Sequence, residues 1–331
     1  MSNAPRPLGR RELLTAAPRS PSPCWLRVHR AAMACRFEVT LSGEDAAHIG
    51  AAQHALREAA RLDAQLSVFR DTSELTRVNR RAYQDAVPVS RDLFSLLRRC
   101  HELHAATDGA FDVTSTPLSR CWGFLRREGR LPPQEAIDAA RSLVGMSAVR
   151  LQPSSRTVVF DRAGLELNLG SIGKGYAVQR IAAALKRAGL RHALVSAGGS
   201  SVYALGGRDG WSVDVTSRRA GRRLARLRLR HGAMGTSGAG EQYLDVNGTC
   251  YGHVLDPRTG WPARGLLSVT VVTANAAAAD ALATAFLVGG EDLARRYCAT
   301  HAGTMVLLTP DDEGGGTTVI GTSAAVEVET L

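Results

Sequence analysis

The sequence predicts an α+β fold. Segments with the 3.6-residue repeat of helices are mixed with segments that show the two-residue repeat of strands, and few of them follow a β-α-β order. A doubly wound parallel sheet needs that order throughout, so separate layers of sheet and helix are expected instead. Of the 331 residues, 44% are apolar, which is enough for one large domain or two smaller ones.

Five segments have the periodicity of helices. Residues 45–66 place Ile49, Ala52 and Leu56 on one face, and residues 92–107 end at an Asp-Gly pair. The remaining predicted helices cover residues 132–143, 175–188 and 276–288, the last two followed by glycines.

Nine short segments are typical of strands, because they are rich in apolar and β-branched residues and end at turn-forming residues. They cover residues 35–41, 157–160, 165–169, 193–196, 223–230, 243–246, 268–273, 305–309 and 318–320.

The first 24 residues are rich in proline, arginine and serine. Arg10 and Arg11 precede a short apolar run, as at the start of a signal peptide, but Pro18 soon ends that run. We therefore expect a disordered leader over residues 1–24 and one functional domain over residues 25–331. The chain is expected in the cytoplasm rather than the periplasm, and without the roughly 20 apolar residues of a transmembrane segment.

The formal net charge is +10, which raises the question of a nucleic-acid partner. Lysine occurs only at positions 174 and 186, so nearly all basic residues are arginine, and coding bias explains this better than a nucleic-acid interface. The densest run alternates Arg226, Arg228 and Arg230 with leucines, as in a strand with one solvated face. Attraction to an acidic partner or to phosphate is the alternative.

Within residues 167–176, three glycines and Lys174 lie at the expected start of the helix over 175–188. A helix N-terminus presents unpaired N–H groups and a partial positive charge, which suits phosphate. A Walker A loop is excluded, because Gly175 replaces its Ser or Thr and Asn168 replaces its first glycine. The segment is either another phosphate or nucleotide cradle, or a simple turn with Lys174 exposed.

Asp280 and Thr284 are four residues apart in an apolar predicted helix, so they share one face. A carboxylate and a hydroxyl on one face are oxygen ligands of the kind that Mg²⁺ prefers. A charge on an apolar helix also needs a partner. The alternative is an aspartate favoured by the helix dipole, with Thr284 bonded to its own helix.

Two further segments carry useful side chains. His253 follows a strand end and precedes a turn, where it is placed to act as a general base near neutral pH. A half-buried histidine bonded to backbone is the alternative. Residues 107–124 contain Phe111, Trp122 and Phe124, which either flank a planar ring or fill the core.

Several common catalytic motifs are missing. No serine lies in a Gly-x-Ser-x-Gly segment, and no HExxH segment supports a zinc protease. The six cysteines include no C-x-x-C pair, so they indicate a reducing compartment rather than a zinc or dithiol site.

In this order, the segments resemble the FAD:protein FMN transferase family, the ApbE-type flavin transferases. The resemblance runs from about residue 33 to residue 308 and rests on short matches whose shared order makes chance improbable. These matches are Met33, Leu66-Ser67-Val68-Phe69-Arg70 with Ser73-Glu74 and Asn79, Gly109-Ala110-Phe111-Asp112, Trp122-Gly123-Phe124, Gly173-Lys174-Gly175-Tyr176, Ala197-Gly198-Gly199, Thr236-Ser237-Gly238, and residues 253–262 and 280–284.

The resemblance implies a T-fold-like α+β fold, with mixed antiparallel sheets, packed helices and FAD held in a cleft. It implies Mg²⁺-dependent transfer of FMN from FAD to a Thr or Ser hydroxyl of an acceptor flavoprotein, with release of AMP. Mg²⁺ would be bound by Asp280, Thr284 and the backbone carbonyl of Ser171. Lys174 would neutralise phosphate charge and His253 would take the hydroxyl proton. The positions implied to contact FAD are Met33, Phe69, Ala110, Phe111, Asp112, Asn168, Lys174 and Leu255.

The sequence departs from the family pattern at three positions. Asn168 and Gln179 stand where acidic residues are common, and Ser200 stands where an aspartate is frequent. Two other functions stay open: a pyrophosphatase that splits FAD into FMN and AMP with water as acceptor, and a non-catalytic FAD-binding protein. The presence of Asp280, Thr284 and His253 favours an enzyme over a non-catalytic FAD-binding protein.

Overall fold

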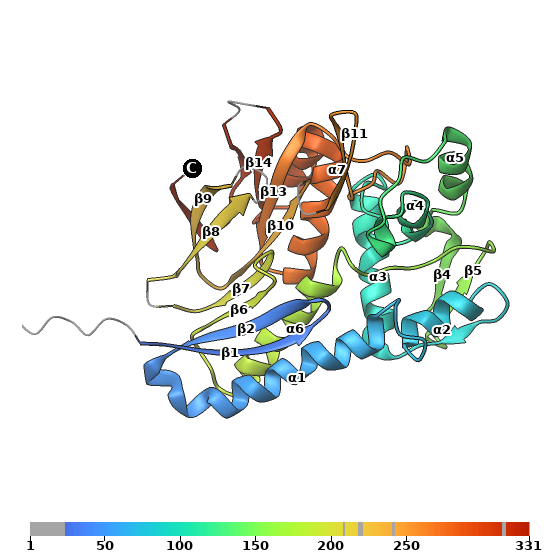
Figure 1. Ribbon diagram of the computed structural model, residues 1–331. Coiled ribbons are helices and arrows are strands. Elements are labelled where there is room, and N and C mark those ends of the chain that lie inside the picture. The colour runs from blue at the N-terminus through green and yellow to red at the C-terminus, as the bar shows by residue number, and fades with distance from the viewer. Residues whose placement is uncertain (1–23, 208, 218–220, 240–241, 313–315, 331) are drawn as a thin grey trace, which may run out of the picture.

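The computed structural model describes residues 24–207, 209–217, 221–239, 242–312 and 316–330. Within these ranges, antiparallel sheets and helices form separate layers, which confirms the predicted α+β class (Figure 1). The leader predicted over residues 1–24 lies outside the described residues, apart from Cys24. No helix in the described ranges is long and apolar enough to cross a membrane.

A sheet of eight strands forms the centre of the molecule, and neighbouring strands run antiparallel. In order across the sheet, its strands are β1 (Trp25–Ala32), β2 (Cys35–Ser42), β6 (Ala193–Ala197), β7 (Ser201–Leu205), β10 (Gly232–Gly238), β13 (Leu266–Thr273), β14 (Met305–Pro310) and β15 (Thr318–Gly321). The strand predicted over residues 35–41 is confirmed as β2, in which Phe37, Val39 and Leu41 are buried on one face.

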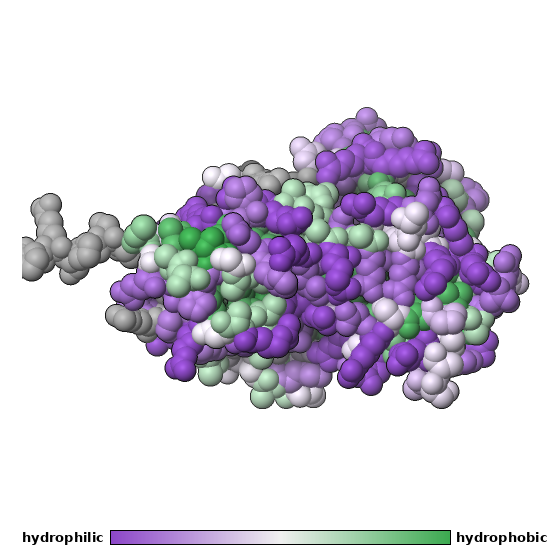
Figure 2. All heavy atoms as spheres, turned by 90° about the horizontal axis from the view of Figure 1, so that it is seen from below, coloured by the Kyte–Doolittle hydropathy of each residue, from purple (hydrophilic) through white to green (hydrophobic). Residues whose placement is uncertain are grey.

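Three helices cover one face of this sheet: α1 (Ile49–Leu66), α6 (Gly173–Arg187) and α7 (Ala276–Thr300). Their apolar stripes join the sheet in the largest core cluster, while hydrophilic side chains cover most of the outer face on which α1 lies (Figure 2). The helix α7 packs closely on β10 at Gly235, where an added Cβ would lie 2.4 Å from the carbonyl carbon of Ala279.

A small sheet packs on the opposite face, with strand order β16 (Val326–Thr330), β9 (Arg222–Leu229) and β8 (Trp211–Ser217). On β9, Leu227 is buried against the main sheet, while the neighbouring arginines lie on the other face. Arg226 donates to Asp214 at 2.7 Å and Arg228 donates to Glu329 at 2.6 Å. The arginine run is therefore a solvated strand face, as predicted.

A second group of elements lies beyond the C-terminal end of α1 (Figure 1). Its three-stranded sheet has the order β3 (Val87–Pro88), β5 (Thr157–Phe160) and β4 (Val149–Gln152). The other elements of this group are α2 (Glu74–Arg81), α3 (Arg91–Ala106), α4 (Thr116–Cys121), α5 (Gln134–Ser142), the hairpin of β11 (Tyr243–Val246) and β12 (Thr249–Gly252), and the 3-10 helices η2 (Phe124–Arg126) and η3 (Met146–Ala148). A further 3-10 helix, η1 (Gly43–His48), lies between β2 and the N-terminal end of α1.

The prediction of a strand over residues 165–169 is wrong. This segment makes only an isolated bridge, between Ser115 and Glu166. The side-chain amide of Asn79 takes the place of a neighbouring strand, because its Nδ2 donates to the carbonyl of Leu167 and its Oδ1 accepts from the N–H of Leu167, both at 2.9 Å.

Two predicted helix boundaries also need correction. The helix predicted over 276–288 was expected to end at its glycines, but α7 resumes after a kink at Gly290, which has φ 72°, and continues to Thr300. The helix predicted over 45–66 begins as the 3-10 helix η1. A strand that was not predicted, β1, precedes the segment expected to be the first strand. Its residues are exposed or half-buried, so the alternation along it is too weak to identify a strand from sequence.

Candidate active site

Two adjoining cavities lie beside the N-terminus of α6 and the first turns of α7. The first encloses about 320 Å³ and the second about 220 Å³. Asn168, Gly170 and Lys174 line both. The first cavity is lined by Ala110, Phe111, Asp112, Ser171, His253, Leu255, Asp280 and Thr284 of the predicted set, and the second by Met33 and Phe69. The fold therefore brings all the predicted site residues to one continuous region.

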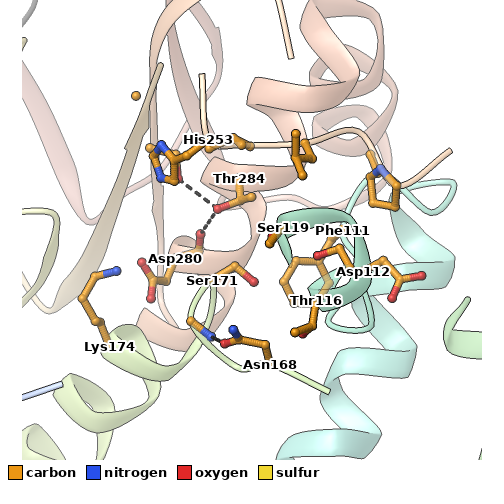
Figure 3. A pocket seen from close by; sticks show the side chains of 18 of the residues that line it. Phe111, Asp112, Thr116, Ser119, Asn168, Ser171, Lys174, His253, Asp280 and Thr284 are labelled. Carbon is orange, nitrogen blue, oxygen red and sulfur yellow. Dashed lines mark hydrogen bonds between the residues drawn. The ribbon is translucent and has the colours of Figure 1, made fainter. Parts of the chain in front are cut away.

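The carboxylate of Asp280 is buried and held in place on the wall of the first cavity. Its residue is only 3% exposed, and both oxygens accept hydrogen bonds: Oδ1 from the hydroxyl of Ser201 at 3.0 Å and Oδ2 from the N–H of Gly175 at 2.9 Å. The N–H of Gly175 was expected to be available to phosphate, but it is used here to hold the carboxylate. Asp280 therefore has one fixed orientation toward Ser171 and Lys174 (Figure 3).

The hydroxyl of Thr284 lies one helical turn further along α7. It is hydrogen-bonded to the hydroxyl of Ser237 on β10 at 3.0 Å and lies 3.5 Å from the carbonyl of Asp280 (Figure 3). Asp280 and Thr284 thus share the helix face that was predicted, and that face is turned to the cavity.

His253 lies across the cavity from the start of α6 (Figure 3). Its Nδ1 is 3.1 Å from the carbonyl oxygen of Gln242, and its own N–H donates to the same oxygen at 3.0 Å. A carbonyl can only accept, so Nδ1 is the donor and, in the neutral ring, the lone pair is on Nε2. This tautomer suits a group that takes up a proton.

Asp112 belongs to the cavity wall, yet its side chain is turned away from Asp280 (Figure 3). Its Oδ1 accepts from the N–H and the hydroxyl of Thr114 at 2.7 and 2.6 Å, and its Oδ2 accepts from the N–H of Met146 at 3.1 Å. Nδ1 of His104 lies 3.3 Å from the same carboxylate. Asp112 therefore anchors the loop that presents Ala110 and Phe111.

Two of the three aromatic residues considered for ring binding fill a separate core instead. Trp122 and Phe124 are buried in the cluster formed by α4, α5 and the β11–β12 hairpin. The indole N–H of Trp122 donates to the carbonyl of Gly260 at 2.9 Å. Only Phe111 reaches the first cavity.

Cys35 is near the charged groups of the site and is not suited to nucleophilic chemistry. Burial raises the pKa of its thiol above the ordinary value; Lys174 opposes this effect and Asp280 adds to it. The thiol is therefore protonated near neutral pH.

The family of the chain follows from a comparison with known proteins. The model of the ApbE family matches residues 33–308. The chain belongs to the ApbE family. A relative from Vibrio cholerae named FAD:protein FMN transferase is 29% identical over 257 residues, which are 76% of each chain. One from Escherichia coli K12 with the same name is 28% identical and covers 76% of this chain and 74% of its own length.

Solved structures of ApbE proteins have the same fold. The ApbE protein of Thermotoga maritima is 29% identical, with a TM-score of 0.81 over 90% of this chain and 97% of the other. The flavinyl transferase ApbE of Pseudomonas stutzeri, in its apo form, is 28% identical, with a TM-score of 0.79 over 90% and 95% of the two chains. The fold expected from the resemblance is thereby confirmed.

The residues at which this ApbE chain departs from the expected pattern have structural partners. Oδ1 of Asn168 accepts from the N–H of Gly170 at 2.9 Å and so shapes the turn before α6. Oε1 of Gln179 accepts from the N–H of Ala276 at 2.7 Å, which caps the start of α7. In both cases the amide oxygen accepts a hydrogen bond from a backbone N–H, as a carboxylate oxygen would. Ser200 lines the first cavity.

Sequence reasoning missed several polar residues of the site. No sequence pattern singles out Ser201, although its hydroxyl orients Asp280. Thr236 and Ser237 belong to the family resemblance alone, because hydroxyl residues on a strand have no distinctive spacing. Among the described residues, no group of three or more His, Cys, Asp or Glu side chains is arranged to hold a metal ion. A metal at Asp280 would thus depend on hydroxyl, carbonyl and substrate oxygens.

Proposed function

We propose that this chain is a transferase that moves the FMN part of FAD to a Thr or Ser hydroxyl of an acceptor flavoprotein, with Mg²⁺ bound and AMP released. Family membership and the name shared by the relatives support it. One observation carries it: the buried carboxylate of Asp280 is held on the wall of a cavity that Lys174 and His253 also line. A carboxylate, a cation and a candidate base are the groups that hydroxyl attack on a phosphoanhydride requires.

Mg²⁺ fits the donor set of the first cavity. Asp280, Thr284 and the carbonyl of Ser171 offer hard oxygen atoms, and Mg²⁺ usually takes one or two carboxylates together with substrate phosphates and water. Hydrogen bonds from Ser201 and Gly175 orient the carboxylate, as expected of groups behind a metal ligand. When bound, Mg²⁺ would withdraw charge from the phosphate oxygens.

His253 supplies the proton acceptor in this proposal. The acceptor hydroxyl oxygen forms a bond to the phosphorus of the FMN part, the bond from that phosphorus to the bridging oxygen breaks, and AMP leaves with the bridging oxygen. The hydroxyl proton passes to Nε2 of His253, whose tautomer is set by the Gln242 carbonyl. The ammonium group of Lys174 offsets charge on the phosphates.

The second cavity suits a planar ring of FAD. Met33, Leu66, Val68, Phe69 and Leu169 give it an apolar lining, and the shared residues Asn168 and Lys174 connect it to the first cavity. Phe69 is 75% exposed, so its ring is available to stack on a ligand. One FAD molecule could then place a ring in the second cavity and its pyrophosphate beside Asp280.

The test is incubation of the full chain with FAD, Mg²⁺ and flavin-carrying subunits of electron-transfer complexes as acceptors. Covalent transfer gives a fluorescent acceptor band on a denaturing gel together with AMP, and the band is lost when the modified Thr or Ser is replaced by Ala. Release of AMP and FMN without a band would support a pyrophosphatase instead. FAD binding without AMP release would support a non-catalytic FAD-binding protein.

A further inference from the structure

We propose that Asp63 is a positioning residue for FAD, because it holds in place the two-residue turn formed by Met33 and Ala34. We call this the Met33 turn. The inference rests on the proposed function, since it requires FAD in the second cavity. The turn joins β1 to β2 and its tip lies beside the C-terminal end of α1, which carries Asp63 (Figure 1).

The Met33 turn has an unfavourable sequence for its conformation. Ala32 pairs with Cys35 across the hairpin, and the two residues between them, Met33 and Ala34, have φ angles of 49° and 55°. Two-residue turns with both φ angles positive strongly prefer Asn-Gly, because a Cβ is disfavoured in this region.

The same chain uses the preferred pair elsewhere. In the β11–β12 hairpin, Val246 pairs with Thr249, and the turn between them is Asn247 and Gly248, with φ angles of 51° and 78°. Strained conformations of this kind persist where the surrounding structure imposes them, and they gather at ligand sites. The Met33 turn lines the second cavity, whereas the Asn247–Gly248 turn does not.

Asp63 is the group that imposes the conformation. Its Oδ1 accepts a hydrogen bond from the N–H of Met33 at 3.0 Å, and its Oδ2 accepts from Nη2 of Arg70 at 2.8 Å. One carboxylate therefore ties the Met33 turn to the loop that follows α1.

The loop that follows α1 forms another wall of the second cavity through Phe69. Phe69 precedes Arg70, and its N–H donates to the hydroxyl of Ser67 at 3.2 Å, while the carbonyl of Arg70 accepts from the N–H of Ser73 at 3.0 Å. Since the loop is fixed by its own hydrogen bonds, Asp63 sets the position of Met33 relative to Phe69. A pre-positioned wall reduces the ordering that FAD binding would otherwise require.

The experiment measures FAD affinity by flavin fluorescence and the melting temperature of each variant. D63A should raise the Kd for FAD about tenfold, the loss expected if only about a tenth of the molecules keep the turn in place. D63N should keep most of the affinity that D63A loses, because its amide oxygen can still accept from the N–H of Met33 and only the bond from Arg70 is lost. The double variant D63A/A34G should recover most of the affinity, since glycine adopts a positive φ without steric conflict.

A matched control separates the turn from general stability. Arg156 has the same strained φ, 50°, in the turn between β4 and β5, and it lines neither cavity. D63A/R156G should gain melting temperature on the order of 2 °C relative to D63A, but no FAD affinity.

Three outcomes would overturn the inference: D63A binding FAD as tightly as wild type, failure of A34G to restore binding, or equal restoration by R156G. A wild-type chain that binds no FAD would refute the proposed function itself.

Discussion

Gly175, at the start of α6, donates its backbone N–H to Oδ2 of Asp280 in α7 at 2.9 Å. The two residues are 105 positions apart in the chain. The contact exists because the helices approach very closely: an added Cβ at Gly175 would lie 2.1 Å from the carbonyl oxygen of Ala276 and 2.7 Å from Cβ of Asp280. The absence of a side chain at Gly175 therefore sets the position of the candidate metal ligand.

Replacing Gly175 by Ala should push α6 and α7 apart. We expect G175A to lower the free energy of unfolding by about 1–3 kcal/mol and to reduce AMP release. Chemical denaturation measures the first effect. The control is G50A in α1, where an added Cβ meets nothing within 4 Å. Since alanine favours the helix, G50A should gain about 0.5–1 kcal/mol. Equal stability of G175A and wild type would contradict the close contact.

Asp280 should be essential for the reaction. D280N keeps the shape of the side chain but removes the charge, so AMP release should fall by about 10²-fold or more and should no longer respond to Mg²⁺. Asp292 provides the matched control, because it is an exposed carboxylate on the same helix. D292N should behave as wild type. Mg²⁺-dependent activity that survives in D280N would refute the metal assignment.

His253 should affect the chemical step more than binding. We expect H253A to lower the rate of FMN transfer by about 10²–10⁴-fold, while FAD affinity stays near that of wild type. Single-turnover kinetics and FAD titration separate the two. Added imidazole should restore part of the rate if the lost group is a base. An unchanged rate in H253A would rule out this role.

His101 should make the fold sensitive to acid. Burial lowers its pKa below the ordinary value, and Nε2 is buried with no hydrogen-bond partner among the described residues. The folded chain thus binds its proton less readily than the unfolded chain, so stability should fall as the pH drops below about 6.5, the ordinary pKa of histidine.

Urea denaturation at pH 7 and pH 5 tests this expectation. The decrease in stability should be smaller for H101Q than for wild type. H54Q replaces an exposed histidine on α1 and should keep the wild-type decrease. If H101Q and wild type lose stability equally, His101 is not the responsible group.

The local sequence pattern was sufficient to predict many of the helices and strands. The segment predicted over 157–160 is β5, and the predictions for α3 and α6 are within two residues of the observed ends. Periodicity works there because burial on one face repeats every 2 or 3.6 residues in any such element. It failed over residues 165–169, where a distant side chain, Asn79, pairs with the backbone of Leu167.

The sequence alone determined the family resemblance and the set of candidate residues, because these depend on residue types and their order. It could not determine how those residues are held. Only the tertiary structure decided that Ser201 and Gly175 orient Asp280, that the Asp112 carboxylate is bonded to the N–H of Met146 and turned away from Asp280, and that Asp63 holds the Met33 turn. Each of these contacts joins residues at least 30 positions apart, and such pairs have no signature in a local pattern.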